Sequence, residues 1–189
     1  MKPERLNALT DGVVAIVLTI MVLELKIPAE NTLGAVMAVL PLMAAYLLAF
    51  IYVAIYWNNH HHMMQSATRV TGAVLWANNA LLFWLTLFPL MIRWIDEVGV
   101  TSWPVASFGI VLLCAGVAYQ VLERALMTAE GSESHVRKAV KAGRKEWLSV
   151  LFYLVAVPVA FISPFVSVGI YVLVAIGWLI PDRRFERYR

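Results

Sequence analysis

The residues of this sequence that could do chemistry are ionisable side chains set inside or beside long apolar runs. Asp11 lies near the start of the first run, and His60, His61 and His62 follow the second. Histidine is a common metal ligand and titrates near neutral pH, so three in a row could bind a metal or sense protons. Adjacent residues on a helix point about 100° apart, however, so these three cannot all bind one ion. We therefore expect no metal site and no cofactor.

The polar residues could instead pair with one another where helices meet. Polar groups within a membrane usually face protein or water, and the end of the second run lies on the same side as the start of the first. Asn78, deep in the third run, needs a partner on another helix. We expect a buried polar network that fixes how the helices pack, with His60 or His61 as the histidine in it. The residues available for this network are Arg5, Thr10, Asp11, Trp57, His60, His61 and Asn78.

The centre of the first run carries a regular apolar stripe. Between Gly12 and Leu23 there is no charge, and Thr19 is the only polar side chain. Ile16, Ile20 and Leu23 recur at i, i+4 and i+7, which places three bulky side chains on one helix face with Thr19 beside them. In a single bundle this stripe would be core. If several copies met on a symmetry axis, it would form stacked apolar rings, and such a constriction can gate a pore by dewetting.

Apolar helices are the elements that must position these residues. Of the 189 residues, 61% are hydrophobic and 14% are charged, whereas roughly 25% of the residues in a soluble domain are charged. Six runs approach the length of about 20 residues that a membrane-spanning helix needs. Their ranges are 7–27, 34–57, 70–91, 104–122, 147–162 and 165–180. We predict an all-α integral membrane protein with six transmembrane helices in a single domain over residues 1–189.

The basic residues predict how the chain lies in the membrane. Six spans put both termini on one side, and of the 15 Lys and Arg residues only Lys26 and Arg93 then fall on the other. Cytoplasmic segments carry the excess of Lys and Arg, so we expect both termini in the cytoplasm of a cell with this protein in its plasma membrane. The basic segments, including the potentially amphipathic stretch 133–146, would contact anionic lipids, and we expect no nucleic-acid partner.

Four segments of the sequence resemble the transmembrane protein 175 potassium-channel family. The family motif in the first helix is Arg, three residues, then Phe-Ser-Asp-Gly. Arg5, Asp11 and Gly12 match it, whereas Leu9 and Thr10 replace the Phe and the Ser. The resemblance covers nearly the whole chain. Its segments are "RLNALTDGVVAIVLTIMVLELKIP" over 5–28, "WNNHH" over 57–61, "NNALLFWLTLFP" over 78–89 and "WLIPDRRFER" over 178–187.

The resemblance implies a homotetramer in which the first helix of each six-helix subunit lines a central pore. Ile16, Ile20 and Leu23 would form the constriction in place of a carbonyl filter, and no "TVGYG" stretch occurs in the sequence. Thr19 would be the one pore-lining side chain near it with an oxygen atom. The polar network would support the pore helix from behind. We therefore expect a channel that is permeable to potassium and other monovalent cations.

The alternative function is a proton-coupled transporter or proton pathway, in which Asp11 and His60 or His61 form the relay. A transporter of this size is expected to have internal repeats and broken helices near the midplane, and the sequence suggests neither. An enzyme is not expected, because no nucleophile and base stand at a usable spacing.

Overall fold

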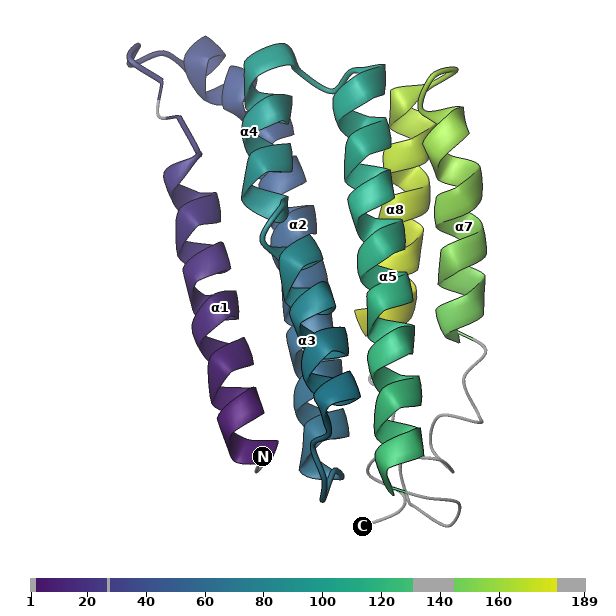
Figure 1. Ribbon diagram of the computed structural model, residues 1–189. Coiled ribbons are helices and arrows are strands. Elements are labelled where there is room, and N and C mark those ends of the chain that lie inside the picture. The colour runs from purple at the N-terminus through teal and green to yellow at the C-terminus, as the bar shows by residue number, and fades with distance from the viewer. Residues whose placement is uncertain (1–2, 27, 131–144, 180–189) are drawn as a thin grey trace.

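The computed structural model describes residues 3–26, 28–130 and 145–179. Within these ranges the chain forms helices and no strand. Figure 1 shows the helices side by side in one bundle, with α1 at one edge and α7 at the other. The helices are α1 (Pro3–Leu23), α2 (Leu33–Gln65), α3 (Gly72–Leu85), α4 (Phe88–Val98), α5 (Ser102–Glu130), α7 (Lys145–Val159) and α8 (Pro164–Leu179).

Threonine caps and a glycine set several helix ends. The Thr32 hydroxyl accepts a hydrogen bond from the Ala35 N–H at 3.1 Å before α2, and Thr71 caps α3 in the same way through Val74. These caps satisfy N–H groups that have no partner within the first turn. α4 ends at Gly99, whose φ of 77° lies in the left-handed region that favours glycine.

The third predicted run, 70–91, is two helices placed end to end. α3 ends at Leu85 and α4 begins at Phe88, with Pro89 in its first turn. Proline has no N–H and is best tolerated where a helix begins, which explains the break. α4 continues to Val98, and its buried apolar side chains face the core. Together α3 and α4 are long and apolar enough to cross a membrane once. The six predicted runs therefore correspond to α1, α2, α3 with α4, α5, α7 and α8.

α2 and α5 are longer than the apolar runs that predict them. α2 covers 33 residues, which is about 50 Å of helix against an apolar bilayer core of about 30 Å. His60, His61 and His62 therefore lie on the helix itself and not in a loop after it. The predicted surface helix over 133–146 lies outside the described residues except for Lys145 and Glu146, which begin α7.

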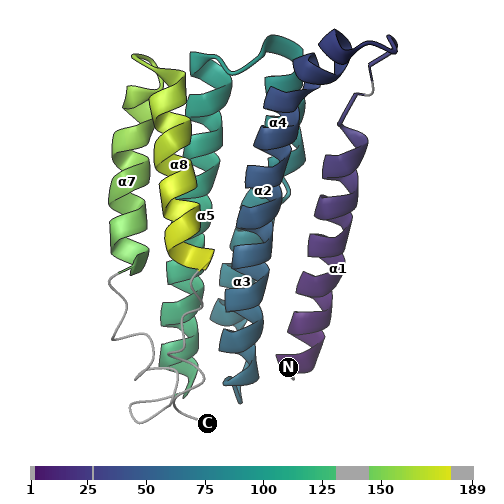
Figure 2. The ribbon, with the colours of Figure 1, turned by 180° about the vertical axis from the view of Figure 1, so that it is seen from behind.

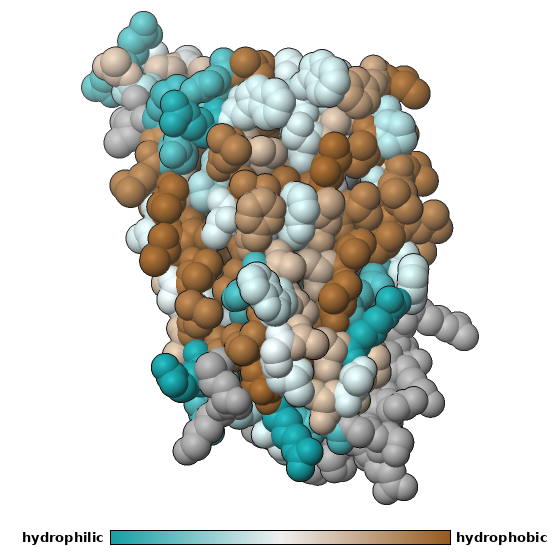
Figure 3. All heavy atoms as spheres, in the orientation of Figure 1, coloured by the Kyte–Doolittle hydropathy of each residue, from teal (hydrophilic) through white to brown (hydrophobic). Residues whose placement is uncertain are grey.

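α5 is the central helix of the bundle. It packs against α3, α4, α7 and α8, whereas α1 packs against α2, α3 and α4. Figure 2 shows α2 and α8 on the face opposite to that seen in Figure 1. The outer surface is largely apolar, and Figure 3 shows hydrophobic side chains over most of the middle of one face. Such a surface suits contact with lipid tails, and four of the described helical segments are long and apolar enough to span a membrane.

Candidate functional site

α1 has one face in the bundle and one face outside it. The buried side chains are Leu6, Thr10, Val14, Val17 and Met21. On the other face, Ile16 is 59% exposed, Ile20 is 42% exposed and Leu23 is 81% exposed. The stripe that would be core in a single bundle is therefore uncovered in one copy of the chain. A contiguous apolar stripe of this kind is covered by lipid or by another protein surface.

Thr19 lies on this exposed face of α1. Its hydroxyl is within hydrogen-bond distance of two backbone carbonyl oxygens, at 2.5 Å from Ala15 and 3.1 Å from Ile16. A threonine hydroxyl in a helix commonly donates its proton to the preceding turn in this way. The lone pairs of the Thr19 oxygen remain available to accept a hydrogen bond or to contact a cation.

A buried chain of hydrogen bonds joins α1, α2 and α3. Asn78 Oδ1 accepts from His60 Nε2 at 2.8 Å, and Asn78 Nδ2 donates to Thr10 Oγ1 at 3.2 Å. Thr10 Oγ1 in turn donates to the Leu6 carbonyl at 3.1 Å. All three side chains are buried, so each needs these partners. The donors and acceptors match when His60 carries a proton on Nε2. These hydrogen bonds then fix which side of α1 faces α3.

A second contact, closer to the surface, joins Asp11 to α2. Trp57 Nε1 donates to Asp11 Oδ1 at 2.8 Å. The Trp57 ring is stacked on His61 with ring centroids 5.6 Å apart, and His61 Nε2 lies 2.7 Å from Gln65 Nε2. His60 and His61 thus have different surroundings, because only His60 points into the core. Asp11 has a direct hydrogen bond from α2, but its partner is the indole and not a histidine.

Two polar residues singled out in the sequence lie apart from these contacts. Arg5 is exposed, and within the described residues no hydrogen bond or ion pair joins it to Asp11 or Trp57. His62 is also exposed, and its ring meets only the edge of the His61 ring in this cluster. The described part of the chain contains no group of three His, Cys, Asp or Glu residues that could hold a metal ion.

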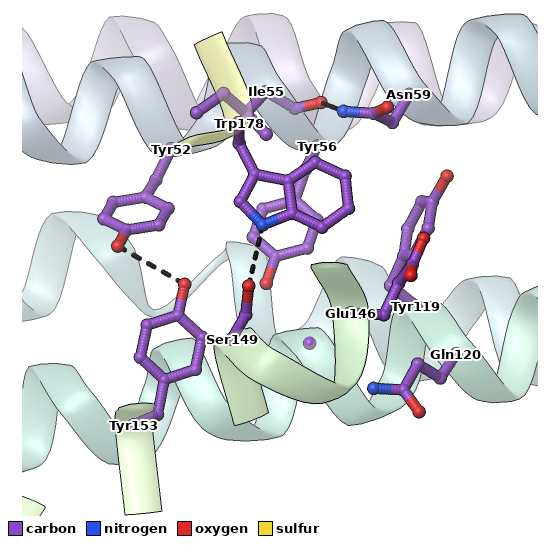
Figure 4. Close-up of a pocket in the computed structure, with 11 residues that line it drawn as sticks. Tyr52, Ile55, Tyr56, Asn59, Tyr119, Gln120, Glu146, Ser149, Tyr153 and Trp178 are labelled. Carbon is purple, nitrogen blue, oxygen red and sulfur yellow. Dashed lines mark hydrogen bonds between the residues drawn. The ribbon is translucent and has the colours of Figure 1, made fainter. Parts of the chain in front are cut away.

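A cluster of tyrosines on the other side of α2 was not predicted. Tyr52 Oη donates to the Tyr171 carbonyl at 2.6 Å, and Tyr153 Oη lies 3.3 Å from Tyr52 Oη. Figure 4 shows these hydroxyls and the Trp178 indole around a small cavity. Its volume of about 40 Å³ is enough for a few waters. The tyrosines lie far apart in the sequence, so only their apolar surroundings and hydroxyl groups could have suggested the cluster.

This cavity is separate from the exposed face of α1. Its lining comes from α2, α5, α7 and α8, with no residue of α1. The hydrogen bonds around it join helices to one another, including the 2.8 Å bond from Trp178 Nε1 to Ser149 Oγ. We interpret this cluster as internal support and take the exposed face of α1 as the candidate functional site.

The fold and this site define a multi-pass helical membrane protein whose first helix carries an uncovered apolar stripe. Residues 5–89 match the family described as "Endosomal/lysosomal potassium channel TMEM175". A potassium channel of Chryseobacterium sp. is 45% identical over 97% of this chain and 95% of its own length. The chain therefore belongs to the TMEM175 family of potassium channels, as its motifs predict.

Two further comparisons agree with this assignment. A potassium channel of Chamaesiphon minutus is 29% identical over 91% of each chain. The crystal structure of a lysosomal potassium-selective channel TMEM175 homolog from Chamaesiphon minutus has a TM-score of 0.81 at 26% identity, over 95% of this chain and 97% of that one. The fold is thus that of the family, and the chain is not an enzyme. The matched range 5–89 contains both the stripe on α1 and the polar contacts behind it.

Proposed function

We propose that this chain is a potassium-permeable channel for monovalent cations, whose pore is lined by α1 from four copies. The observation that carries the proposal is the exposed stripe of Ile16, Ile20 and Leu23 on α1. Its relatives in Chryseobacterium sp. and Chamaesiphon minutus are named as potassium channels. Four such stripes around an axis would cover one another and form the walls of a narrow path.

The proposed constriction works without a carbonyl filter. Rings of Ile16, Ile20 and Leu23 offer no oxygen to replace the hydration shell of an ion, so passage depends on pore width and on partial dehydration. Selectivity between potassium and sodium should then be weaker than in carbonyl filters. Thr19 is the nearest polar group on the same face, and its oxygen gives it a modest part in contacting the ion.

The polar contacts behind α1 would hold the pore helix in its rotational position. Thr10 is tied to α3 through Asn78, and Asp11 is tied to α2 through Trp57. Asp11 is then structural support and not an ion ligand. We assign Arg5 to the same supporting region, because it begins the motif that contains Thr10 and Asp11.

The proton relay is the less favoured function. His60 is bonded to Asn78 and Asp11 to Trp57, so no direct hydrogen bond joins the two titrating groups of the relay in the described structure. The family assignment also favours a channel. We further propose that the protein lies in the plasma membrane with both termini in the cytoplasm, in keeping with the distribution of basic residues.

The first test is the reversal potential of purified protein in a planar bilayer under a potassium gradient. We expect reversal near the potassium equilibrium potential, with currents too large for a carrier. Replacing potassium by sodium should shift the reversal only moderately, because apolar rings discriminate weakly. A reversal that follows an imposed proton gradient would overturn the proposal in favour of the relay.

A second test addresses the constriction itself. Ile16→Asn and Ile20→Asn each place a polar amide on the proposed rings, which should favour water in the pore and raise the conductance severalfold. Leu173→Asn is the matched control, because Leu173 is an exposed apolar residue of α8. α8 packs against α2, α5 and α7, so the control places the same amide away from the proposed pore helix. Conductance unchanged in both α1 variants, or raised equally in the control, would reject this constriction.

A further inference from the structure

The bundle contains two neighbouring cavities whose linings include no residue of α1. The first, the inner cavity, has a volume of about 240 Å³ and lies between α2, α4, α5 and α8. The second, the mouth, has a volume of about 450 Å³ and includes Lys26 and Asp96. They lie next to one another, because four residues line both of them. The shared residues are Pro41, Ile95, Val100 and Phe165.

The inner cavity is apolar throughout. Every residue that lines it is aliphatic, aromatic or proline, including Ala44, Leu48, Phe108 and Val168. Its walls come from four helices, two of which, α2 and α8, lie on the face shown in Figure 2. An apolar cavity of about 150 Å³ is large enough to bind benzene, so this one can hold a segment of hydrocarbon. Water would gain few hydrogen bonds there.

The mouth carries both signs of charge. Lys26 Nζ lies 2.6 Å from Asp96 Oδ2, with the Lys26 side chain 70% exposed and the Asp96 side chain 13% exposed. The hydrogen bond to Asp96 raises the pKa of Lys26, so the ammonium stays charged at neutral pH. Lys26 follows the end of α1, and Asp96 lies in the last turn of α4. The charged groups therefore lie at the end of the spanning helices, where lipid headgroups are found.

The charges around the mouth favour one class of lipid. Besides the Lys26 and Asp96 pair, the same end of the bundle carries Arg93 bound to Glu97 at 3.1 Å. Glu24 and Glu30, close to Lys26 in the chain, add negative charge. This excess of carboxylates repels an anionic headgroup. A zwitterionic headgroup can place its phosphate at Lys26 and its ammonium at a carboxylate.

We propose that the two cavities form a binding site for a zwitterionic phospholipid. One acyl chain occupies the inner cavity, and the headgroup lies between Lys26 and Asp96. The apolar inner cavity and the charged mouth beside it match the polarity of the two ends of such a lipid. The site is distinct from the proposed pore, since no residue of α1 lines either cavity.

The test measures lipid retained by the purified full chain in detergent. Phosphatidylethanolamine or phosphatidylglycerol with identical acyl chains is added, and bound lipid is counted by native mass spectrometry. We expect phosphatidylethanolamine to be retained at about one per subunit and preferred over phosphatidylglycerol by about tenfold. Equal retention of the two lipids, or retention of neither, would overturn the proposal. No current is measured, so the result is independent of the proposed conduction.

Variants locate the lipid. Ala44→Phe and Val168→Phe fill the inner cavity from two different helices, α2 and α8, and should each lower retention about tenfold. Met43→Phe is the matched control, because Met43 is exposed at the same depth of α2 and does not line the cavity. Lys26→Gln should reduce the preference for phosphatidylethanolamine, whereas Arg69→Gln, an exposed arginine between α2 and α3, should not.

Each variant is checked for folding by its melting temperature. Wild-type retention in both cavity-filling variants would overturn the proposal. Loss of the oligomer in Ala44→Phe and Val168→Phe, without any change in bound lipid, would also overturn it. That outcome would show that a second copy of the chain covers this face.

Discussion

Asn78 is the residue on which the contact between α1, α2 and α3 depends. Its amide both accepts from His60 and donates to Thr10, so one side chain satisfies two buried partners. A buried polar group left without a partner costs about 1–3 kcal/mol. Removing Asn78 leaves buried His60 without this hydrogen bond and leaves Thr10 with only its bond to the Leu6 carbonyl.

Asn78→Leu should lower the free energy of unfolding by about 1–3 kcal/mol, since at similar side-chain volume it removes the bond that His60 makes to Asn78 and the bond that Thr10 accepts from it. The measurement is thermal or denaturant unfolding of the detergent-solubilised protein, followed by circular dichroism. Asn79→Leu is the control, because Asn79 is the exposed neighbour on α3. Equal destabilisation by the two variants would show that the buried chain of hydrogen bonds contributes little.

At the scale of helices, Gly109 of α5 lies directly against the Tyr171 side chain of α8 and the Val157 side chain of α7. A Cβ atom built on Gly109 would lie 2.0 Å from Tyr171 Oη and 3.0 Å from a Val157 methyl carbon. Tyr171 is fully buried and its hydroxyl donates to the Val105 carbonyl at 3.2 Å. The ring therefore has no free space to move into, and glycine is required here for close packing and not for its backbone freedom.

Gly109→Ala should separate α5 from α8 and lower the free energy of unfolding by about 1–3 kcal/mol, the usual cost of overpacking a core. Gly116→Ala, seven residues along the same helix, provides the control. Its added Cβ would be 3.6 Å from Tyr56 Oη, an ordinary contact, so little change is expected. Both variants are compared by the same unfolding measurement. A Gly109→Ala variant as stable as Gly116→Ala would contradict the packing described here.

At the scale of the whole molecule, α1 leaves an apolar face that either lipid or another copy of the chain has to cover. A single chain exposes Ile16, Ile20 and Leu23 on one side while its network residues face the other. The proposed tetramer brings these stripes together on an axis. In the membrane, lipid could also cover them, so the oligomer has to be tested by proximity between copies.

Leu23→Cys, in a Cys114→Ala background, should form disulfides between subunits on mild oxidation. In the proposed tetramer the copies of Leu23 surround one axis, and thermal motion has to bring two of them to the Cβ separation of about 3.5–4.5 Å that a disulfide needs. The product is a dimer band on a non-reducing gel of protein oxidised in membranes. Met21→Cys is the control, because Met21 is buried against the subunit's own core.

A different cross-linking pattern would contradict a pore lined by α1. If Leu23→Cys stayed monomeric while Leu173→Cys on α8 gave dimers, the copies would meet through α8. The stripe on α1 would then face lipid. Native mass spectrometry of the unmodified protein gives the number of subunits independently.

Sequence patterns predicted the helical membrane class and the family, and both predictions are confirmed. The class followed from long apolar runs, whose composition is incompatible with water on all sides. The family followed from local motifs, of which Arg5, Asp11 and Gly12 belong to one helix. Boundaries were less predictable, because the His60–His62 segment of α2 is polar yet remains helical. The apolar run 70–91 predicted a single span that Pro89 could kink, whereas the structure has a full break between α3 and α4, with Pro89 in the first turn of α4.

The sequence by itself determined which side chains form a stripe on α1, because helical periodicity alone puts Ile16, Ile20 and Leu23 on one face. It also identified polar residues that need partners in an apolar setting. Only the tertiary structure decided which face of α1 turns inward, and which histidine meets Asn78. These outcomes depend on the packing of three helices at once, and contacts between residues such as Thr10 and Asn78, 68 positions apart, leave no local pattern. The same holds for Tyr52 and Tyr171, and for the cavity shared by four helices.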